Sequence, residues 1–204
     1  MSRVSRAASL VTFDAMMKRI HILAIEAGNE PHALRSACEH WGAQITVTWA
    51  GNSAEIIDYF SEVPADDLLI ISGHGEQDAL LLPQLHESIA DNYPFRDRIT
   101  SSELCSFVKM GGGCVLSLCC ESGTKRMAHA FLTGGASLYI GPSGSPDGNV
   151  ALMYALELLY ACLVEKKSID QGHQEASKHD DDRASFVIYK GIEPDNRECL
   201  LRHK

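Results

Sequence analysis

GCVLSLCCESG, residues 113–123, is a short apolar run that ends in two adjacent cysteines and closes on a glycine. An earlier run, DLLIISGHG at residues 67–75, has the same form and carries His74 near its end. An apolar run of this length, closed by glycine, is typical of a strand that is buried on both faces. Because ligands bind just past the carboxyl ends of such strands, we expect His74 and Cys120 to lie at a site.

A histidine and a cysteine on neighbouring strand ends can serve as a base and a nucleophile. The glycines around His74 allow close approach of a ligand and positive φ, and the N–H of Gly75 can then donate to an oxyanion. In an extended strand Cys119 and Cys120 point to opposite faces, so one of them at most faces His74. The alternatives are structural: a turn that contains a histidine, and two buried thiols.

Strand and helix signals alternate along the rest of the chain. Helical spacing and capping patterns separate the apolar or β-branched runs. Strands are expected at residues 19–28, 45–51, 68–72, 114–118, 136–141 and 185–191. Capping patterns stand at Asn52 with Glu55, Thr100 with Glu103, Asp147, and Ser168 with Gln171. This alternation predicts an α/β fold, with a mainly parallel sheet of about six strands and helices on both faces.

The sequence divides into a leader, residues 1–18, which we expect to be loosely ordered, and a single domain over residues 19–204. Within residues 76–99, LLLPQL at 80–85 can form a short hairpin strand. HESIADNYPFRDR at 86–98 is polar and carries a proline, so it predicts an excursion over the surface that helps to shape the site. We expect the loop at residues 141–147 to flank the site from the other side. There is no internal repeat and no linker between domains.

The composition excludes several classes of function. The net charge is −9 with only 18 Lys and Arg, which argues against nucleic-acid binding. The longest apolar stretch, Val150 to Val164, is shorter than the ~20 residues that span a bilayer. The leader lacks the apolar core of a signal peptide. We therefore expect a cytoplasmic protein that does not bind a membrane.

The seven cysteines contain no CxxC pair, which favours buried free thiols over a zinc cluster. His173 and His179 lie near three aspartates, residues 180–182, but a solvated helix end explains them better than a metal site. The first strand turn, EAGNEP, lacks a G-x-G-x-x-G fingerprint. We expect no metal and no cofactor, with a nucleotide- or flavin-binding doubly wound domain as an alternative.

The order of the two motifs separates families. Glutamine amidotransferases and α/β-hydrolases place the nucleophile before the histidine, in a tight elbow such as G-x-C-x-G, and this chain has neither feature. Here ISGHG resembles the histidine motif of metacaspases and caspases, and VLSLCCESG resembles the C-E-S-G motif of CHAT domains. From about Ile20 to Gly191 the sequence resembles the caspase-like cysteine peptidases of clan CD, most closely those of CHAT or metacaspase type.

The resemblance implies a caspase-like three-layer sandwich and a cysteine endopeptidase, a hydrolase with a Cys–His dyad. It assigns attack on the peptide carbonyl to Cys120, assistance to His74, and oxyanion binding to the N–H groups of Gly75 and Cys120. The motif selects Cys120 over Cys119 because Glu121, Ser122 and Gly123 follow it directly.

The sequence departs from the family at one point that concerns substrates. Members that cleave after Arg or Lys often carry an acidic residue two positions before the cysteine, where this chain has Leu118. Glu76 and Asp78 are the candidates for acidic substrate-binding residues. The expected partners are a peptide or protein substrate and a regulatory protein. The alternative within this fold is a catalytically inactive module that binds a partner protein.

Overall fold

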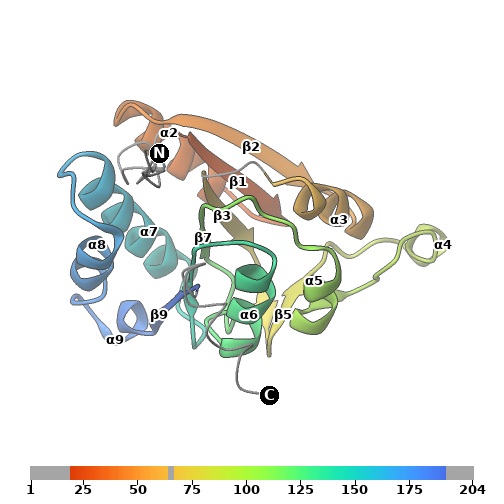
Figure 1. Cartoon of the computed structure of the whole chain (residues 1–204). Coiled ribbons are helices and arrows are strands. Elements are labelled where there is room, and N and C mark those ends of the chain that lie inside the picture. Colours follow the sequence, from red (N-terminus) through yellow and green to blue (C-terminus); the bar gives the residue numbers. More distant parts are fainter. Residues whose placement is uncertain (1–18, 64–66, 192–204) are drawn as a thin grey trace, which may run out of the picture.

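The computed structural model describes residues 19–63 and 67–191, so the predicted leader lies outside the described residues. A six-stranded sheet forms the centre of the molecule, in the order β2-β1-β3-β7-β8-β9 (Figure 1). Its strands are β1 (Arg19–Ile25), β2 (Gln44–Ala50), β3 (Leu68–Gly73), β7 (Cys114–Ser117), β8 (Leu138–Pro142) and β9 (Phe186–Lys190). Every neighbouring pair is parallel except β8 with β9. The prediction of a mainly parallel six-stranded sheet is confirmed.

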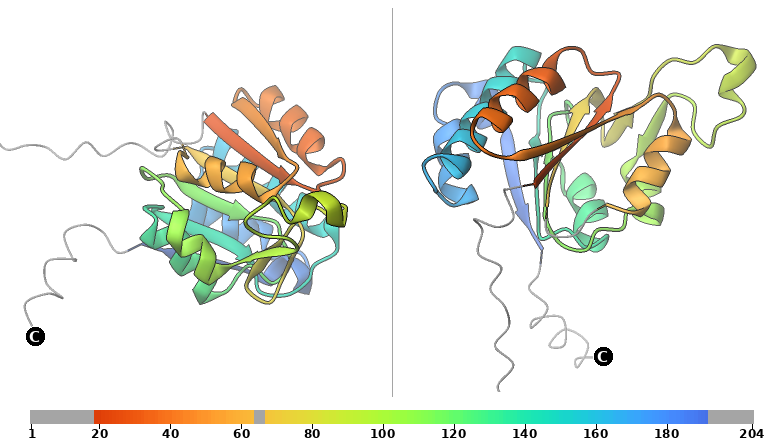
Figure 2. Two further views of the ribbon diagram at one scale, coloured as in Figure 1. Left: turned by 90° about the vertical axis from the view of Figure 1, so that its right-hand side faces the viewer. Right: turned by 90° about the horizontal axis from the view of Figure 1, so that it is seen from above.

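Helices cover both faces of the sheet, so the fold has three layers (Figure 2). On one face lie α2 (Glu30–His40), α7 (Gly148–Leu163) and α8 (Ile169–Ala176), with α9 (Asp181–Ala184) beside α7. On the other lie α3 (Ser53–Ser61), α5 (Ser101–Phe107) and α6 (Lys125–Thr133). Successive side chains of a strand point to opposite faces, so each apolar strand contributes to two cores.

The two hydrophobic cores show this alternation in β3. Leu68 and Ile70 pack with α2 and α7, whereas Leu69 and Ile71 pack with α3 and α6. All four are at most 2% exposed, and burying each side chain contributes about 1.5–3 kcal/mol. This two-sided burial explains why the run before His74 is continuously apolar instead of alternating.

Helix α7 is apolar almost all round because it lies between the sheet and two other helices, α2 and α8. Its N-cap Asp147 accepts a hydrogen bond from the N–H of Asn149 at 2.9 Å. In the described part of the chain, no helix combines the length and the apolar character needed to cross a membrane.

The capping patterns are confirmed at two helices and differ at a third. Thr100 with Glu103 and Ser168 with Gln171 form reciprocal capping boxes. Asn52 accepts from the N–H of Glu55 at 3.0 Å, but the Glu55 carboxylate accepts from Gly51 at 2.7 Å. The side chain therefore caps the residue before the N-cap instead of closing a box.

Residues 76–99 contain more regular structure than the expected hairpin strand and excursion. They contribute to a second sheet, of three antiparallel strands: β4 (Gly75–Glu76), β5 (Ala79–Leu81) and β6 (Arg98–Thr100). Between β5 and β6 the short helix α4 (Glu87–Ala90) stands away from the body of the molecule, at the right-hand edge of Figure 1. The hairpin of β4 and β5 begins one residue after His74, so it is the part of this segment that concerns the site.

Candidate active site

The two motif strands are neighbours at the centre of the sheet. β3 and β7 pair in parallel, with Leu68 opposite Cys114 and Ile71 opposite Ser117. Each strand points its carboxyl end to the same edge, where His74 and Cys120 follow within three residues. The predicted adjacency of these strands is confirmed.

The loops beyond the strands are in direct contact. A Cβ on Gly75 would lie 2.5 Å from the carbonyl oxygen of Cys120 and 3.0 Å from Cβ of Cys119. Real Cβ atoms are not found so close to backbone, so this position accepts only glycine without a shift of the chain. The glycine after the histidine is thus needed for the approach of one motif to the other.

His74 and Cys120 line the same open cavity, of about 410 Å³. The cavity lies between the start of α2, the ends of β3 and β7, and the start of α7. Its other lining residues are Ala27, Gly28, Asn29, Glu30, Ala33, Ser72, Gly73, Leu118, Pro146, Gly148, Asn149, Ala151 and Leu152. The predicted loop after β8 contributes Pro146, whereas residues 76–99 contribute none of the lining.

The two cysteines lie in a turn and not in an extended strand, because β7 ends at Ser117. Their environments nevertheless differ as expected. Cys119 is 0% exposed and packs in the core with α3 and α6, where burial raises its thiol pKa to about 12. Cys120 is partly exposed to the cavity, and its Sγ lies 4.0 Å from the carbonyl oxygen of Pro146.

The charge around Cys120 works against ionisation. Burial raises the pKa of its thiol, and the carboxylates of Glu121 and Glu30 raise it further. A hydrogen bond with Ser145 and one with the backbone lower it in part. A thiol of this kind needs a base or a cation when it reacts, and His74 is the basic side chain on the same cavity.

Buried hydrogen bonds hold the turn after β7 in place. The Ser122 hydroxyl donates to the carbonyl oxygen of Cys119 at 2.7 Å and lies 2.8 Å from Oγ of Ser117. The Tyr139 hydroxyl, from β8, donates to the carbonyl oxygen of Ser122 at 3.0 Å. Ser122 and Tyr139 are both fully buried, so the turn is anchored on its core side.

The N–H of Gly75 is not used by the hairpin that it begins. Leu81 donates its N–H to the carbonyl oxygen of His74 at 3.0 Å, which makes His74 and Leu81 a hydrogen-bonded pair. Hydrogen-bonded pairs alternate along an antiparallel ladder, so Gly75, opposite Leu80, is in a non-bonded pair. Its N–H therefore points away from β5.

Glu30 belongs to the site although the sequence analysis did not identify it. It is the first residue of α2, it lines the cavity, and it accepts a 2.6 Å hydrogen bond from Oγ of Ser72. Burial raises the pKa of its carboxyl, which the Ser72 bond and the charge of His74 lower in part. The sequence offered one signal for Glu30: it is an acidic residue at the start of the helix that follows the first strand, at the same edge of the sheet as His74.

Glu76 and Asp78 lie on the hairpin and do not line the cavity. Glu76 forms an ion pair with Arg98 at 2.9 Å, both half exposed. Asp78 accepts hydrogen bonds from Thr124 and Arg126, and its backbone oxygen accepts from Ser101. The structure does not bring these two carboxylates to the cavity, and their part in substrate binding stays a prediction.

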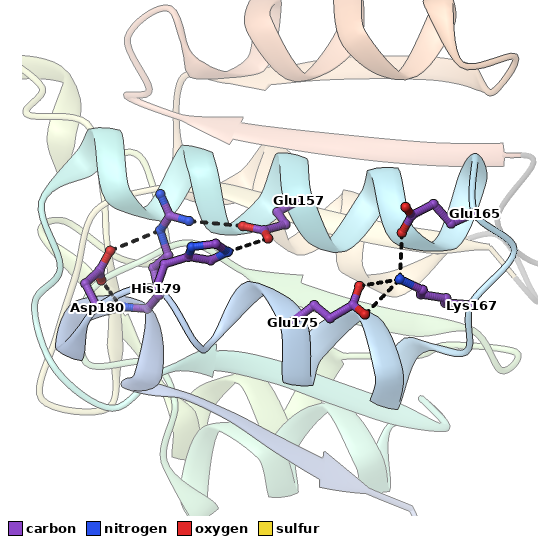
Figure 3. Close-up of polar contacts among 7 residues, drawn as sticks. Glu157, Glu165, Lys167, Glu175, His179 and Asp180 are labelled. Carbon is purple, nitrogen blue, oxygen red and sulfur yellow. Dashed lines mark hydrogen bonds and ion pairs between the residues drawn. The ribbon is translucent and has the colours of Figure 1, made fainter.

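His179 and Asp180 near α9 are held in ion pairs, whereas Nδ1 of His173 lies 2.6 Å from the Tyr154 hydroxyl. Nε2 of His179 lies 2.6 Å from the carboxylate of Glu157 in α7 (Figure 3). Arg183 pairs with Glu157 at 3.0 Å and with Asp180 at 3.2 Å. Within residues 19–63 and 67–191, no three His, Cys, Asp or Glu side chains form a cluster that could hold a metal.

Comparison with known proteins gives no match to any family model and none to the curated proteins. Solved structures do match. The chain is similar to the Arg-specific cysteine proteinase gingipain R, with a TM-score of 0.57 and 12% identity, over 87% of this chain and 47% of that one. It therefore spans about half the length of that chain.

Caspase-1 from Spodoptera frugiperda matches with a TM-score of 0.52 and 13% identity, over 95% of this chain and 94% of that one. A secreted C11 cysteine protease from Bacteroides thetaiotaomicron matches with a TM-score of 0.50 and 10% identity, over 85% and 66% of the two chains. At these identities the likeness concerns the backbone arrangement. The chain thus has the caspase-like fold, which it shares with cysteine peptidases of clan CD.

Proposed function

We propose that this chain is a cysteine peptidase that hydrolyses a peptide bond with Cys120 and His74. The observation that carries the proposal is the contact between the two motif loops: Gly75 packs directly on Cys120, and both predicted side chains line one cavity. The fold alone leaves the chemistry open, since one fold supports many functions. The site residues therefore carry the argument.

In the proposed reaction His74 takes the thiol proton of Cys120 as Sγ attacks the carbonyl carbon of the scissile bond. The N–H groups of Gly75 and Cys120 donate to the oxyanion, and the free orientation of the Gly75 N–H supports this role. His74 protonates the leaving amine, which leaves a thioester on Cys120. Water then attacks the thioester and gives a proton to His74, which returns it to Sγ of Cys120 as the acid is released.

Glu30 lines the same cavity as His74 and Cys120. The charge of His74 lowers the pKa of the Glu30 carboxyl in part, whereas the Glu30 carboxylate raises the pKa of the Cys120 thiol. The described residues show no direct hydrogen bond between His74 and Cys120. The distance between a nucleophile and its base is often longer when no substrate is bound.

The finer assignments belong to the same proposal. The residues after Cys120, Glu121-Ser122-Gly123, favour a CHAT-type member of the clan. The substrate is a peptide or protein, a regulatory protein partner acts on the domain, and neither nucleic acid nor membrane is bound. A cytoplasmic location agrees with the described cysteines, which are all free thiols.

A library of fluorogenic tetrapeptides, varied at the residue before the scissile bond, tests the activity. We expect the wild-type chain to hydrolyse some members, and Cys120→Ala and His74→Ala to hydrolyse none while they keep the wild-type circular dichroism. Cys119→Ala is the matched control and should keep most of the activity. A wild type that cleaves no member would favour the non-catalytic partner-binding module, and an active Cys120→Ala would show that Cys120 is not the nucleophile.

A further inference from the structure

Glu121 links the three loops that surround the candidate nucleophile. It follows Cys120 directly and has φ of 55°, in the left-handed region. Its backbone N–H donates to the carbonyl oxygen of Gly144 at 2.8 Å, in the loop after β8. A residue other than glycine holds this conformation only where its surroundings fix it.

The Glu121 carboxylate binds to both sides of the turn. One oxygen accepts the backbone N–H of Gln77 at 3.0 Å, in the hairpin after His74. The other accepts the hydroxyl of Ser145 at 3.1 Å, in the loop that continues to the cavity wall. A single side chain therefore ties the histidine loop, the cysteine turn and the loop after β8.

The hairpin turn that receives Glu121 is strained. Gln77 and Asp78 form the two-residue connection between β4 and β5, with φ of 42° and 68°. Positive φ at both positions is typical of a type I′ turn, which favours glycine or asparagine. The Asp78 end is held by Thr124 and Arg126, and Glu121 holds the Gln77 end.

We propose that Glu121 is a positioning residue, which holds the Gln77 turn so that the N–H of Gly75 stays directed at the oxyanion. The inference rests on the proposed function, because it assigns the Gly75 N–H a part in the reaction. Glu121 itself lies outside the lining of the cavity and acts on the reaction through the hairpin.

The negative charge of Glu121 allows its role in holding the turn to be distinguished from a direct effect on the Cys120 thiol. The carboxylate raises the pKa of Cys120, so its removal should increase the fraction of thiolate near neutral pH. A residue that activated the thiol would instead lower the pKa of Cys120, and its removal would slow alkylation. Removal of Glu121 should therefore leave alkylation of Cys120 as fast as before, or faster, while it slows turnover.

The first test is amide hydrogen exchange at Gln77, followed by NMR in Glu121→Ala, Glu121→Gln and Ser145→Ala. We expect exchange about tenfold faster in Glu121→Ala, because the acceptor is lost. Glu121→Gln keeps an acceptor oxygen and should exchange like the wild type. Ser145→Ala, the matched control, loses the bonds of Ser145 to Glu121 and to the Cys120 thiol but keeps the bond from Gln77 to Glu121, so it should exchange like the wild type. Unchanged exchange in Glu121→Ala overturns the proposal.

The second test uses the best fluorogenic tetrapeptide of the library and iodoacetamide, which forms no oxyanion. In Glu121→Ala we expect kcat to fall about tenfold with KM within twofold, and iodoacetamide labelling of Cys120 to be undiminished. Glu121→Gln, and Gln77→Gly added to Glu121→Ala, should restore most of kcat. A parallel fall in labelling overturns the proposal. If the wild type cleaves no tetrapeptide, the peptidase proposal fails, and the exchange rates alone then decide whether Glu121 holds the turn.

Discussion

Ser72 of β3 donates a 2.6 Å hydrogen bond to the carboxylate of Glu30 at the start of α2. The bond joins the strand that ends at His74 to a helix on one face of the sheet. It also holds an acidic group in a partly buried position, where burial raises the pKa of the carboxyl above its ordinary value of 4.5. This pair gives a prediction about stability as a function of pH.

Glu30→Gln should become more stable relative to the wild type as the pH rises. A raised pKa in the folded state means that folding favours the protonated acid. Its contribution is fully present below pH 4.5 and is lost as the pH rises through the folded-state pKa. Glutamine is neutral throughout and escapes this loss. Urea unfolding at pH 4 and pH 7 measures the difference, and a pH-independent difference would contradict the prediction.

Gly75→Ala should reduce kcat/KM about 100-fold. The added methyl group would clash with the carbonyl oxygen of Cys120, so the hairpin after His74 and the turn at Cys120 would have to move apart. We also expect a loss of about 1–3 kcal/mol in the free energy of unfolding. Gly51→Ala is the control, since its Cβ would meet only Glu55 at 3.8 Å, an ordinary contact. Equal losses in both variants would contradict the role of the Gly75 contact.

Iodoacetamide should label Cys120 in preference to Cys119, as the difference in their exposure requires. Cys105 is also exposed, so the measurement uses a Cys105→Ser background and peptide mapping near neutral pH. Cys119→Ala should cost about 1–2 kcal/mol by leaving a small void in the core. Labelling of Cys119 before Cys120 would reverse the assignment of the nucleophile.

Glu157→Ala should lower the melting temperature more than Glu175→Ala. Glu157 pairs with Arg183, which is 14% exposed, so its removal leaves a largely buried guanidinium without that partner. Glu175 pairs with Lys167, which also pairs with Glu165, so the ammonium keeps a partner when Glu175 is removed and the cost is small. Thermal unfolding followed by circular dichroism compares the two variants, and an equal shift would show that burial of Arg183 adds nothing.

The sheet could be predicted from the sequence because each strand carries its own signal. The runs that end at His74 and Cys120 are apolar on both faces, and a parallel sheet requires this. Two helices were marked by complete capping boxes, which depend on residues three apart in the sequence. Features that depend only on neighbouring residues can therefore be predicted from the sequence.

Other features depend on contacts between distant residues and left little local signal. The turn of Gln77 and Asp78 contains no glycine or asparagine, so nothing in the sequence predicts a type I′ hairpin there. Glu30 enters the site because α2 begins beside β3, a relationship that the sequence alone does not give. The turn at Cys119 and Cys120 is set by the positive φ of Glu121 and the bonds of Ser122.

The pairing of β3 with β7 also determines when the cavity can form during synthesis of the chain. A nascent chain that has reached the end of β3 carries His74 but not Cys120, and the strands between β3 and β7 belong to a separate small sheet. Even when β7 has paired, the cavity lacks the wall that the start of α7 supplies. Contacts so distant in sequence form late, after the loop between them has closed. We therefore expect Cys120 and His74 to be brought to one cavity only when most of the domain has left the ribosome.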